Sequence, residues 1–294
     1  MLIPFTELLR QAQQNHIAVC YFEAWDIYSL EAVVEAAEFL NVPVIIGFGG
    51  VMMDPEWFNN GGLERLAALG LETANNSKVP MSFILNEVQT YSQIVRGIKA
   101  GFNAVMLDSS DLPYTENVQR TRQVVETAHA VSVGVEAELG TLPDASGEMG
   151  HEEGSPTDPD EAARFVAETG IDALSVSIGN VHVMTKGNAS IDFKRLQEIQ
   201  QKVGIPLVLH GGSGFPEAAI PQAIALGVVK VNIGTVLKQT FFEGIREALS
   251  QLNEKPNIQQ IIGCRKSTDI LQQGKLKMKA EVIRRLKLWS INKT

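Results

Sequence analysis

Histidine and glutamate side chains that could bind a metal ion follow several apolar stretches of the chain. Two of the five histidines, His182 and His210, come after neighbouring apolar runs, and Glu87 and Glu138 lie at the ends of two others. Imidazole nitrogens and carboxylate oxygens are ordinary ligands of Zn²⁺, and an oxygen ligand also suits a harder ion such as Mn²⁺. If the fold brings these side chains to one face, they predict a divalent-metal site. The alternative is a structural role for two unrelated histidines.

Two glycine-containing turns could bind an anion. One is the sequence HGGSG at 210–214, and the other is NIGT at 232–235. Closely spaced glycines let backbone N–H groups face an anion, and the hydroxyls of Ser213 and Thr235 add further donors. We therefore predict a phosphate site across both turns, with a pair of tight β/α turns as the simpler alternative.

Eight short apolar runs alternate with amphipathic stretches and would position these residues. The runs are rich in Val, Ile and Leu and mostly lack alternation with polar residues, which is typical of strands buried on both faces of a parallel sheet. They cover 17–22, 43–48, 81–85, 104–107, 133–139, 173–178, 206–209 and 228–233. Helices are predicted at 28–40, 57–74, 91–100, 115–130, 161–168, 193–203, 217–226 and 236–252.

Eight strand-then-helix units predict a (β/α)₈ TIM barrel, in which active sites form at the C-terminal ends of the strands. A doubly wound open sheet is the competitor, but no GxGxxG follows the first run. The barrel predicts that polar residues at the strand ends surround one mouth: Glu23, Asn86, Glu87, Glu138, His182, His210 and Asn232.

Composition excludes several classes of protein. The chain has 294 residues, 45% of them hydrophobic, and a net charge of −9, which argues against nucleic acid as the main partner. No apolar run reaches the roughly 18 residues that a membrane span needs, and no signal peptide is apparent, so we expect a cytoplasmic protein. Two cysteines are too few for a disulfide framework.

Domain organisation follows from the absence of a linker. We predict one domain over 1–294, with a loop at 141–159 after the fifth strand. The segment from about 264 to 294 is basic and predicts a C-terminal helical extension, solvated or at a subunit contact.

Five stretches together resemble the class II, metal-dependent ketose-bisphosphate aldolases. They are VEAELGTL at 135–142, TDPDEAARFVAETGIDALSVSIGNVH at 157–182, IDFKRLQEI at 191–199, IPLVLHGGSG at 205–214 and ALGVVKVNIGTVLK at 225–238. The similarity covers nearly the whole chain. The eighth run is more similar to the tagatose-bisphosphate branch than to the fructose-bisphosphate branch, because no acid lies between Asn232 and Thr235.

The resemblance implies aldol cleavage or condensation of a ketose phosphate. In this family a zinc ion polarises the ketose carbonyl, and a carboxylate moves the proton of the C4 hydroxyl. By residue match, His182 and His210 correspond to zinc ligands, and Glu138 corresponds to a carboxylate that can approach the metal. Substrate or phosphate contacts correspond to Gly211, Ser213, Asn232 and Thr235, with Lys186 near the phosphate loop.

The departures from the family cluster at the predicted mouth. The family has an Asp-His pair after the third strand, where this chain has Asn86 and Glu87. An Ala-Phe-Asn motif after the first strand is Tyr21-Phe22-Glu23 here. A Gly-Ser-His after the fourth strand is Ser109-Ser110-Asp111, and the glycine after His182 is Val183.

Two interpretations of these changes stay open. In the first, Asn86 and Glu23 are the candidate catalytic residues and Glu87 takes the third metal position. Asn86 has no titratable proton, so Glu23 or an acid of the 141–159 loop (Glu148, Glu152 or Glu153) supplies the proton transfer on an altered sugar phosphate. In the second, the protein is a paralogue without aldolase activity that binds a sugar phosphate or assists a partner subunit. The resemblance also implies a homo-oligomer, a dimer or tetramer.

Overall fold

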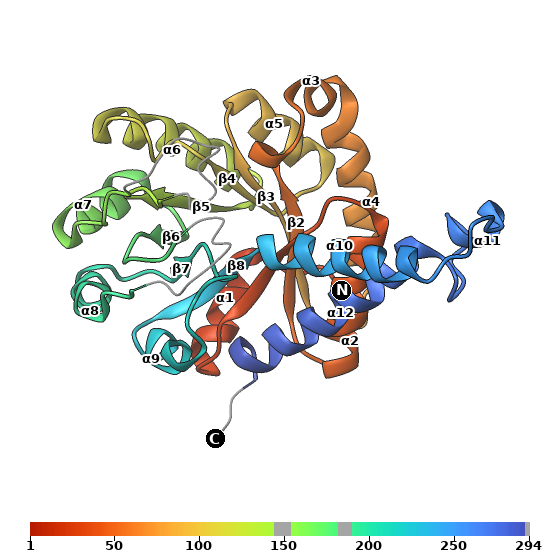
Figure 1. The fold of residues 1–294 in the computed structure, drawn as a ribbon. Coiled ribbons are helices and arrows are strands. Elements are labelled where there is room, and N and C mark those ends of the chain that lie inside the picture. Colours follow the sequence, from red (N-terminus) through yellow and green to blue (C-terminus); the bar gives the residue numbers. More distant parts are fainter. Residues whose placement is uncertain (144–153, 182–189, 292–294) are drawn as a thin grey trace.

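Eight parallel strands close into a barrel in the computed structural model, which describes residues 1–143, 154–181 and 190–291 (Figure 1). Each strand pairs with the next in sequence, and β8 pairs with β1 to complete the ring. The strands are β1 (Val19–Glu23), β2 (Val44–Gly49), β3 (Met81–Val88), β4 (Ala104–Leu107), β5 (Gly134–Leu139), β6 (Ala173–Val176), β7 (Leu207–Leu209) and β8 (Val228–Ile233). The prediction of a TIM barrel from eight apolar runs is confirmed.

Helices follow the strands and cover the outside of the barrel. They are α2 (Ile27–Leu40), α4 (Leu63–Asn75), α5 (Tyr91–Ala100), α6 (Tyr114–His129), α7 (Pro159–Thr169), α8 (Phe193–Lys202), α9 (Ile220–Ala225) and α10 (Thr235–Ser250). Local sequence sets several of their starts: Asp26 with Ser29, and Thr90 with Gln93, form capping boxes before α2 and α5. The predicted helix 57–74 is divided, because Asn60 and Gly61 have non-helical backbone between the short α3 (Pro55–Trp57) and α4.

The lower interior of the barrel is apolar and is closed by an N-terminal helix, α1 (Phe5–Gln14). Its residues Phe5, Leu8 and Leu9 pack against inward-facing side chains such as Ile45 and Val208. Alternate strand residues face outward and pack against the surrounding helices. The core is therefore in two parts, and inside the barrel the apolar part gives way to buried polar side chains such as Glu136, His210 and Lys230.

Two irregularities in the sheet set which residues face inward near the mouth. The β7–β8 register shifts so that Val228 pairs with Leu207 but Lys230 pairs with Val208. A second shift lies between Leu85 and Val88, where β3 meets β4. An extra residue in one strand changes the phase of alternation, so the β7–β8 shift lets Lys230 and Asn232 point into the barrel although Val228 faces outward.

The C-terminal extension consists of α11 (Ile258–Ile261) and α12 (Ile270–Trp289), and α12 lies along α2 and α10 (Figure 1). The expectation of a solvated helix was wrong for one face of α12, because Met278, Val282, Leu286 and Trp289 are fully buried, whereas the opposite face is exposed. Several basic residues of α12 form ion pairs with glutamates of the same chain. Within the described ranges, no helix is long and apolar enough to cross a membrane.

Candidate active site

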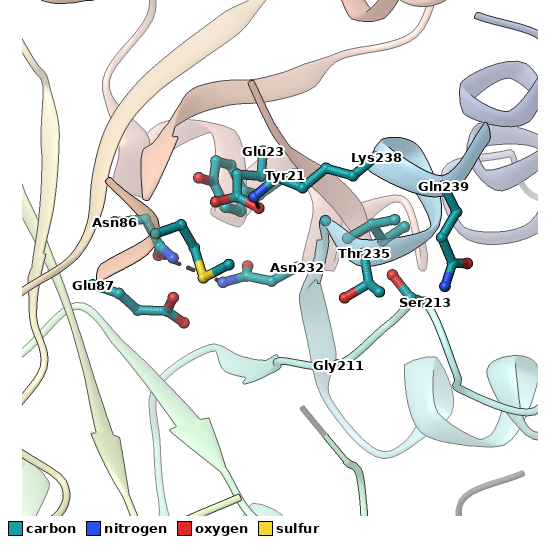
Figure 2. Close-up of a pocket in the computed structure, with 13 residues that line it drawn as sticks. Tyr21, Glu23, Asn86, Glu87, Gly211, Ser213, Asn232, Thr235, Lys238 and Gln239 are labelled. Atoms are coloured by element: carbon teal, nitrogen blue, oxygen red, sulfur yellow. Dashed lines mark hydrogen bonds and ion pairs between the residues drawn. The ribbon is translucent and has the colours of Figure 1, made fainter. Parts of the chain in front are cut away.

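A cavity opens at the C-terminal ends of the strands and gathers most of the predicted mouth. Figure 2 shows Glu87 and Asn86 at one end, Ser213 and Gln239 at the other, and Tyr21, Glu23 and Asn232 between them. The lining also includes two predicted phosphate contacts, Gly211 and Thr235. These residues come from β1, β3, β8, the turn after β7 and the start of α10, so five parts of the chain build one site.

His210 is the hub of the buried polar side chains beneath this cavity. Its Nδ1 lies 2.8 Å from Oε1 of Glu87 and 3.3 Å from Oε2 of Glu138, and its Nε2 lies 2.9 Å from Oε1 of Glu136. Burial lowers the pKa of His210, but the contacts with Glu136 and Glu87 outweigh it and raise the pKa to about 10. The structure therefore brings together three of the four predicted metal ligands.

A buried lysine, which the sequence analysis did not identify, supports Glu136. Lys230 is fully buried, and its Nζ lies 3.0 Å from Oε1 and 2.8 Å from Oε2 of Glu136. Lys230 also donates to Oδ1 of Asn232, whose Nδ2 is 3.5 Å from Oδ1 of Asn86. Although burial opposes ionisation, Lys230 and His210 hold the pKa of Glu136 below its usual value.

Carboxylates outnumber cations in this layer of the described structure. Burial and the neighbouring Asp108 and Glu87 raise the pKa of Glu138 to about 7. Burial and Glu87 also raise the pKa of Asp108, whose carboxylate accepts a hydrogen bond from Ser110. Burial is the larger cause of both shifts, and repulsion between neighbouring carboxylates adds to it. A divalent cation would relieve that repulsion.

The backbone of Glu87 has a conformation that is uncommon for a residue with a side chain. Its φ is +49°, in the left-handed region, which costs on the order of 1–3 kcal/mol and is frequent at functional sites. The register shift of β3 is at the same place. Together they turn the side chain of Glu87 toward His210. Plain alternation along β3 would put it on the other face of the sheet from Asn86.

The predicted phosphate cradle, formed by the turns at 210–214 and 232–235, is hydrogen-bonded to the C-terminal extension. Ser213 Oγ accepts a hydrogen bond from the backbone N–H of Val236 in the first turn of α10. The buried guanidinium of Arg285, in α12, donates to the carbonyl oxygens of Gly212 and Ser213 at 3.1 Å each. The positive end of α10 and the hydroxyls form an arrangement that suits an anion.

Glu23 lies in a slot that two glycines leave open. A Cβ atom at Gly49 would be 2.7 Å from Oε1 of Glu23, and one at Gly234 would be 2.6 Å from Oε2. The carboxylate makes an ion pair with Lys238 of α10, with Nζ and Oε2 3.3 Å apart. Lys238 was not among the predicted site residues, although it lies four residues after Gly234.

Two predicted residues, His182 and Lys186, lie outside the described residues, as do the loop acids Glu148, Glu152 and Glu153. In the part that is described, no three or more His, Cys, Asp or Glu side chains already form a metal cage. The metal assignment stays a prediction. Asn86 is buried beside Asn232, where its amide can hydrogen-bond but cannot exchange a proton as a carboxyl can.

Comparison with known proteins identifies the family. Residues 3–293 match the family of class II fructose-bisphosphate aldolases. The YdjI aldolase from Escherichia coli K12 is 29% identical, with a TM-score of 0.79 over 98% of this chain and 97% of that one. A protein assigned as a fructose-1,6-bisphosphate aldolase from Coccidioides immitis is 26% identical, with a TM-score of 0.82 over 97% and 95% of the two chains. Fructose-bisphosphate aldolase from Campylobacter jejuni, at 23% identity and a TM-score of 0.74 over 98% and 95%, shares the fold.

The match runs through both cores, the strand ends and the C-terminal extension, and the barrel of these relatives is the barrel described above. The chain therefore belongs to the class II fructose-bisphosphate aldolase family.

Proposed function

We propose that this chain is a metal-dependent aldolase that breaks or forms a carbon–carbon bond in a ketose phosphate, with a changed proton-transfer group. The observation that carries the proposal is the convergence of His210, Glu87 and Glu138 at one end of a cavity whose other end is built for an anion. A sugar phosphate has a carbonyl for the first end and a phosphate for the second.

The donor set fits a divalent ion. Ligands about 2.1 Å from a tetrahedral metal are roughly 3.4 Å from one another. The Nδ1 atom of His210 is 2.8 Å from Oε1 of Glu87 and 3.3 Å from Oε2 of Glu138, so small shifts would open a site. Glu136 on Nε2 fixes the orientation of the ring, as carboxylates do for metal-bound histidines. His182 would complete the set, with Zn²⁺ or Mn²⁺ as the ion.

A divalent ion held there would act as a Lewis acid on the ketose carbonyl. The chain's own residues bind and orient the rest of the substrate. Ser213, Thr235 and the start of α10 would hold the phosphate, with Gly211 and Asn232 on the path between the two ends. The neutral Asn86 would orient a substrate hydroxyl, and the carboxylate of Glu23 would move its proton.

The amide at Asn86 favours one other candidate function, a sugar-phosphate-binding paralogue or partner subunit without catalysis. Binding needs the cradle alone, whereas catalysis also needs a metal and a base. Removing a positioned acid or base commonly costs about 10²–10⁴-fold in rate. Metal content therefore separates the two functions before any substrate is known.

The first experiment measures metal by elemental analysis after purification without chelators. We expect about one zinc or manganese per wild-type chain and strong loss in His210→Ala. His129→Ala is the matched control, because His129 pairs with Asp172 on the barrel exterior. Equal metal content in all three proteins would contradict the proposed site.

The second experiment measures kcat/KM for fructose- and tagatose-bisphosphate in a reversion series. Asn86→Asp alone should recover little activity, because Glu87 would still occupy the position of the family's histidine. Adding Glu87→His should recover far more, and Glu23→Asn more again, because a carboxylate near a phosphate repels it. An ordinary rate in the wild type would show that Asn86 and Glu87 do not change the reaction.

A further inference from the structure

The hydroxyl of Tyr21 is a buried polar group whose hydrogen-bonding capacity is not used within the described chain. Tyr21 lies on β1, two residues before Glu23, so both side chains face the barrel interior. The residue is 1% exposed, and its Oη has no hydrogen-bond partner among the described residues. Because most buried hydroxyls are paired, an orphaned one beside a cavity indicates a missing partner.

The surroundings hold the phenol in place. In the barrel, Tyr21 is beside Asn232 in the β1–β8 register. The ammonium of Lys230 lies 5.2 Å from the centre of its ring, within the range of a cation–π contact. The ring is therefore fixed by packing, while its hydroxyl has no hydrogen-bond partner among the described residues.

The same surroundings determine that the hydroxyl is a donor. Burial and the carboxylates of Glu23, Glu87 and Glu136 raise the pKa of Tyr21 well above 10. A phenol that keeps its proton can donate one hydrogen bond, and the nearby acceptors have other partners: Glu87 and Glu136 face His210, and Glu23 faces Lys238.

We propose that Tyr21 is a specificity-determining residue whose hydroxyl donates a hydrogen bond to an oxygen on the carbon chain of the bound ketose phosphate. This rests on the proposed function. Figure 2 shows Tyr21 between the Glu87 end of the cavity and the Ser213 end, so it faces the middle of a ligand that spans both. The acceptor is therefore a carbonyl or hydroxyl oxygen of the sugar and not the phosphate.

The first test uses stability without ligand. Tyr21→Phe should melt at the same temperature as the wild type or higher, because it removes an unpaired hydroxyl. Tyr91→Phe is the matched control, because the Tyr91 hydroxyl bonds to Thr127 at 2.7 Å on the barrel exterior. Its melting temperature should fall by about 1–3 °C. A comparable fall in Tyr21→Phe would mean a partner inside the protein and would overturn the proposal.

The second test uses dihydroxyacetone phosphate, the smallest ketose phosphate, on the zinc-loaded protein. Titration calorimetry should give an affinity about 3- to 10-fold weaker in Tyr21→Phe and unchanged in Tyr91→Phe. Equal affinity in wild type and Tyr21→Phe would overturn the role of Tyr21 and leave the proposed function standing. No binding to the wild type would overturn both.

A spectroscopic readout locates the acceptor. The chain has four tyrosines, so carbon-13 labelling of the tyrosine Cζ gives four resonances, and Tyr21→Phe assigns one. Dihydroxyacetone phosphate should shift the Tyr21 resonance, and inorganic phosphate alone should not. A Tyr21 resonance that stays in place with bound probe, or that moves equally with inorganic phosphate, would contradict a bond to the carbon chain.

Discussion

The barrel interior has two regions of opposite chemistry: an apolar floor next to α1, and an upper layer of buried charged side chains around His210. At the floor, Leu9 and the other apolar residues of α1 fill the interior against strand residues such as Val208. Two residues after Val208 comes His210, where the interior changes to buried ions that include Lys230 and Glu136. Both regions are almost free of solvent exposure.

The difference shows where this fold gains stability and where it gives some up. Apolar burial stabilises the floor without regard to direction. The buried ions of the upper layer lose their hydration, and ion pairs and hydrogen bonds offset that cost only if every partner is in place. We therefore expect the floor to tolerate changes of shape, and the upper layer to depend on complete pairs.

The largest effect should come from Lys230→Met, which leaves Glu136 buried without its ammonium partner. Breaking a buried ion pair on one side costs about 3–5 kcal/mol in the free energy of unfolding. Urea denaturation would measure it. Lys230→Met combined with Glu136→Gln should recover much of the loss. If Lys230→Met alone were as stable as the wild type, His210 would be enough to compensate the buried charge of Glu136.

Leu9→Ala at the floor should destabilise the protein by about 2–5 kcal/mol, because it leaves a cavity in an apolar core. Leu9→Met should cost less than about 1.5 kcal/mol, because volume is kept. Both variants should keep the metal content of the wild type when folded. If Leu9→Ala lost metal while still folded, the two layers would not be independent.

The upper layer should make the metal-free protein less stable as the pH rises. In the folded protein the pKa is about 7 for Glu138 and about 10 for His210, above the ordinary values of 4.5 and 6.5. Each group thus stabilises the fold fully below its unfolded pKa and loses that contribution as the pH passes its folded pKa. Between pH 5 and 8.5 the loss should be on the order of a few kcal/mol.

Melting temperatures across that pH range, with and without Zn²⁺, would check this. Zinc should stabilise the protein more at high pH, because His210 must release a proton to bind a metal. Glu138→Gln should flatten the slope below pH 7. Stability that rises with pH in the metal-free protein would contradict the assigned direction.

The smallest effect on stability should come from Lys238→Met, which breaks a Lys–Glu pair at the rim. The Lys238 side chain is 37% exposed, whereas Lys230 is fully buried, so the rim pair should contribute at most about 1 kcal/mol. Urea denaturation of both variants tests whether burial determines how much each ion pair stabilises the protein. If Lys238→Met lost as much unfolding free energy as Lys230→Met, burial would not be the deciding factor.

The amino-acid sequence determined the eight strands and most of the helices, because runs buried on both faces and amphipathic stretches are local patterns. It also placed Glu87, Glu138 and His210 in one group, since strand ends in a barrel meet at one mouth. The glycine turns predicted the phosphate cradle, which stays a proposal. The helix at 57–74 was partly wrong, because local propensity did not show the break at Asn60 and Gly61.

Only the tertiary structure decided which other side chains complete the site. Plain alternation would put Val228 and Lys230 on one face of β8, and the register shift with β7 separates them. Arg285 reaches the cradle from more than 70 residues away along the chain. The basic residues of the C-terminal helix predicted a solvated surface, but several of their partners are distant in sequence: Glu31 and Glu35 for Lys275, and the carbonyls after β7 for Arg285. Long-range pairing of buried charges depends on packing, and no local pattern in the chain records it.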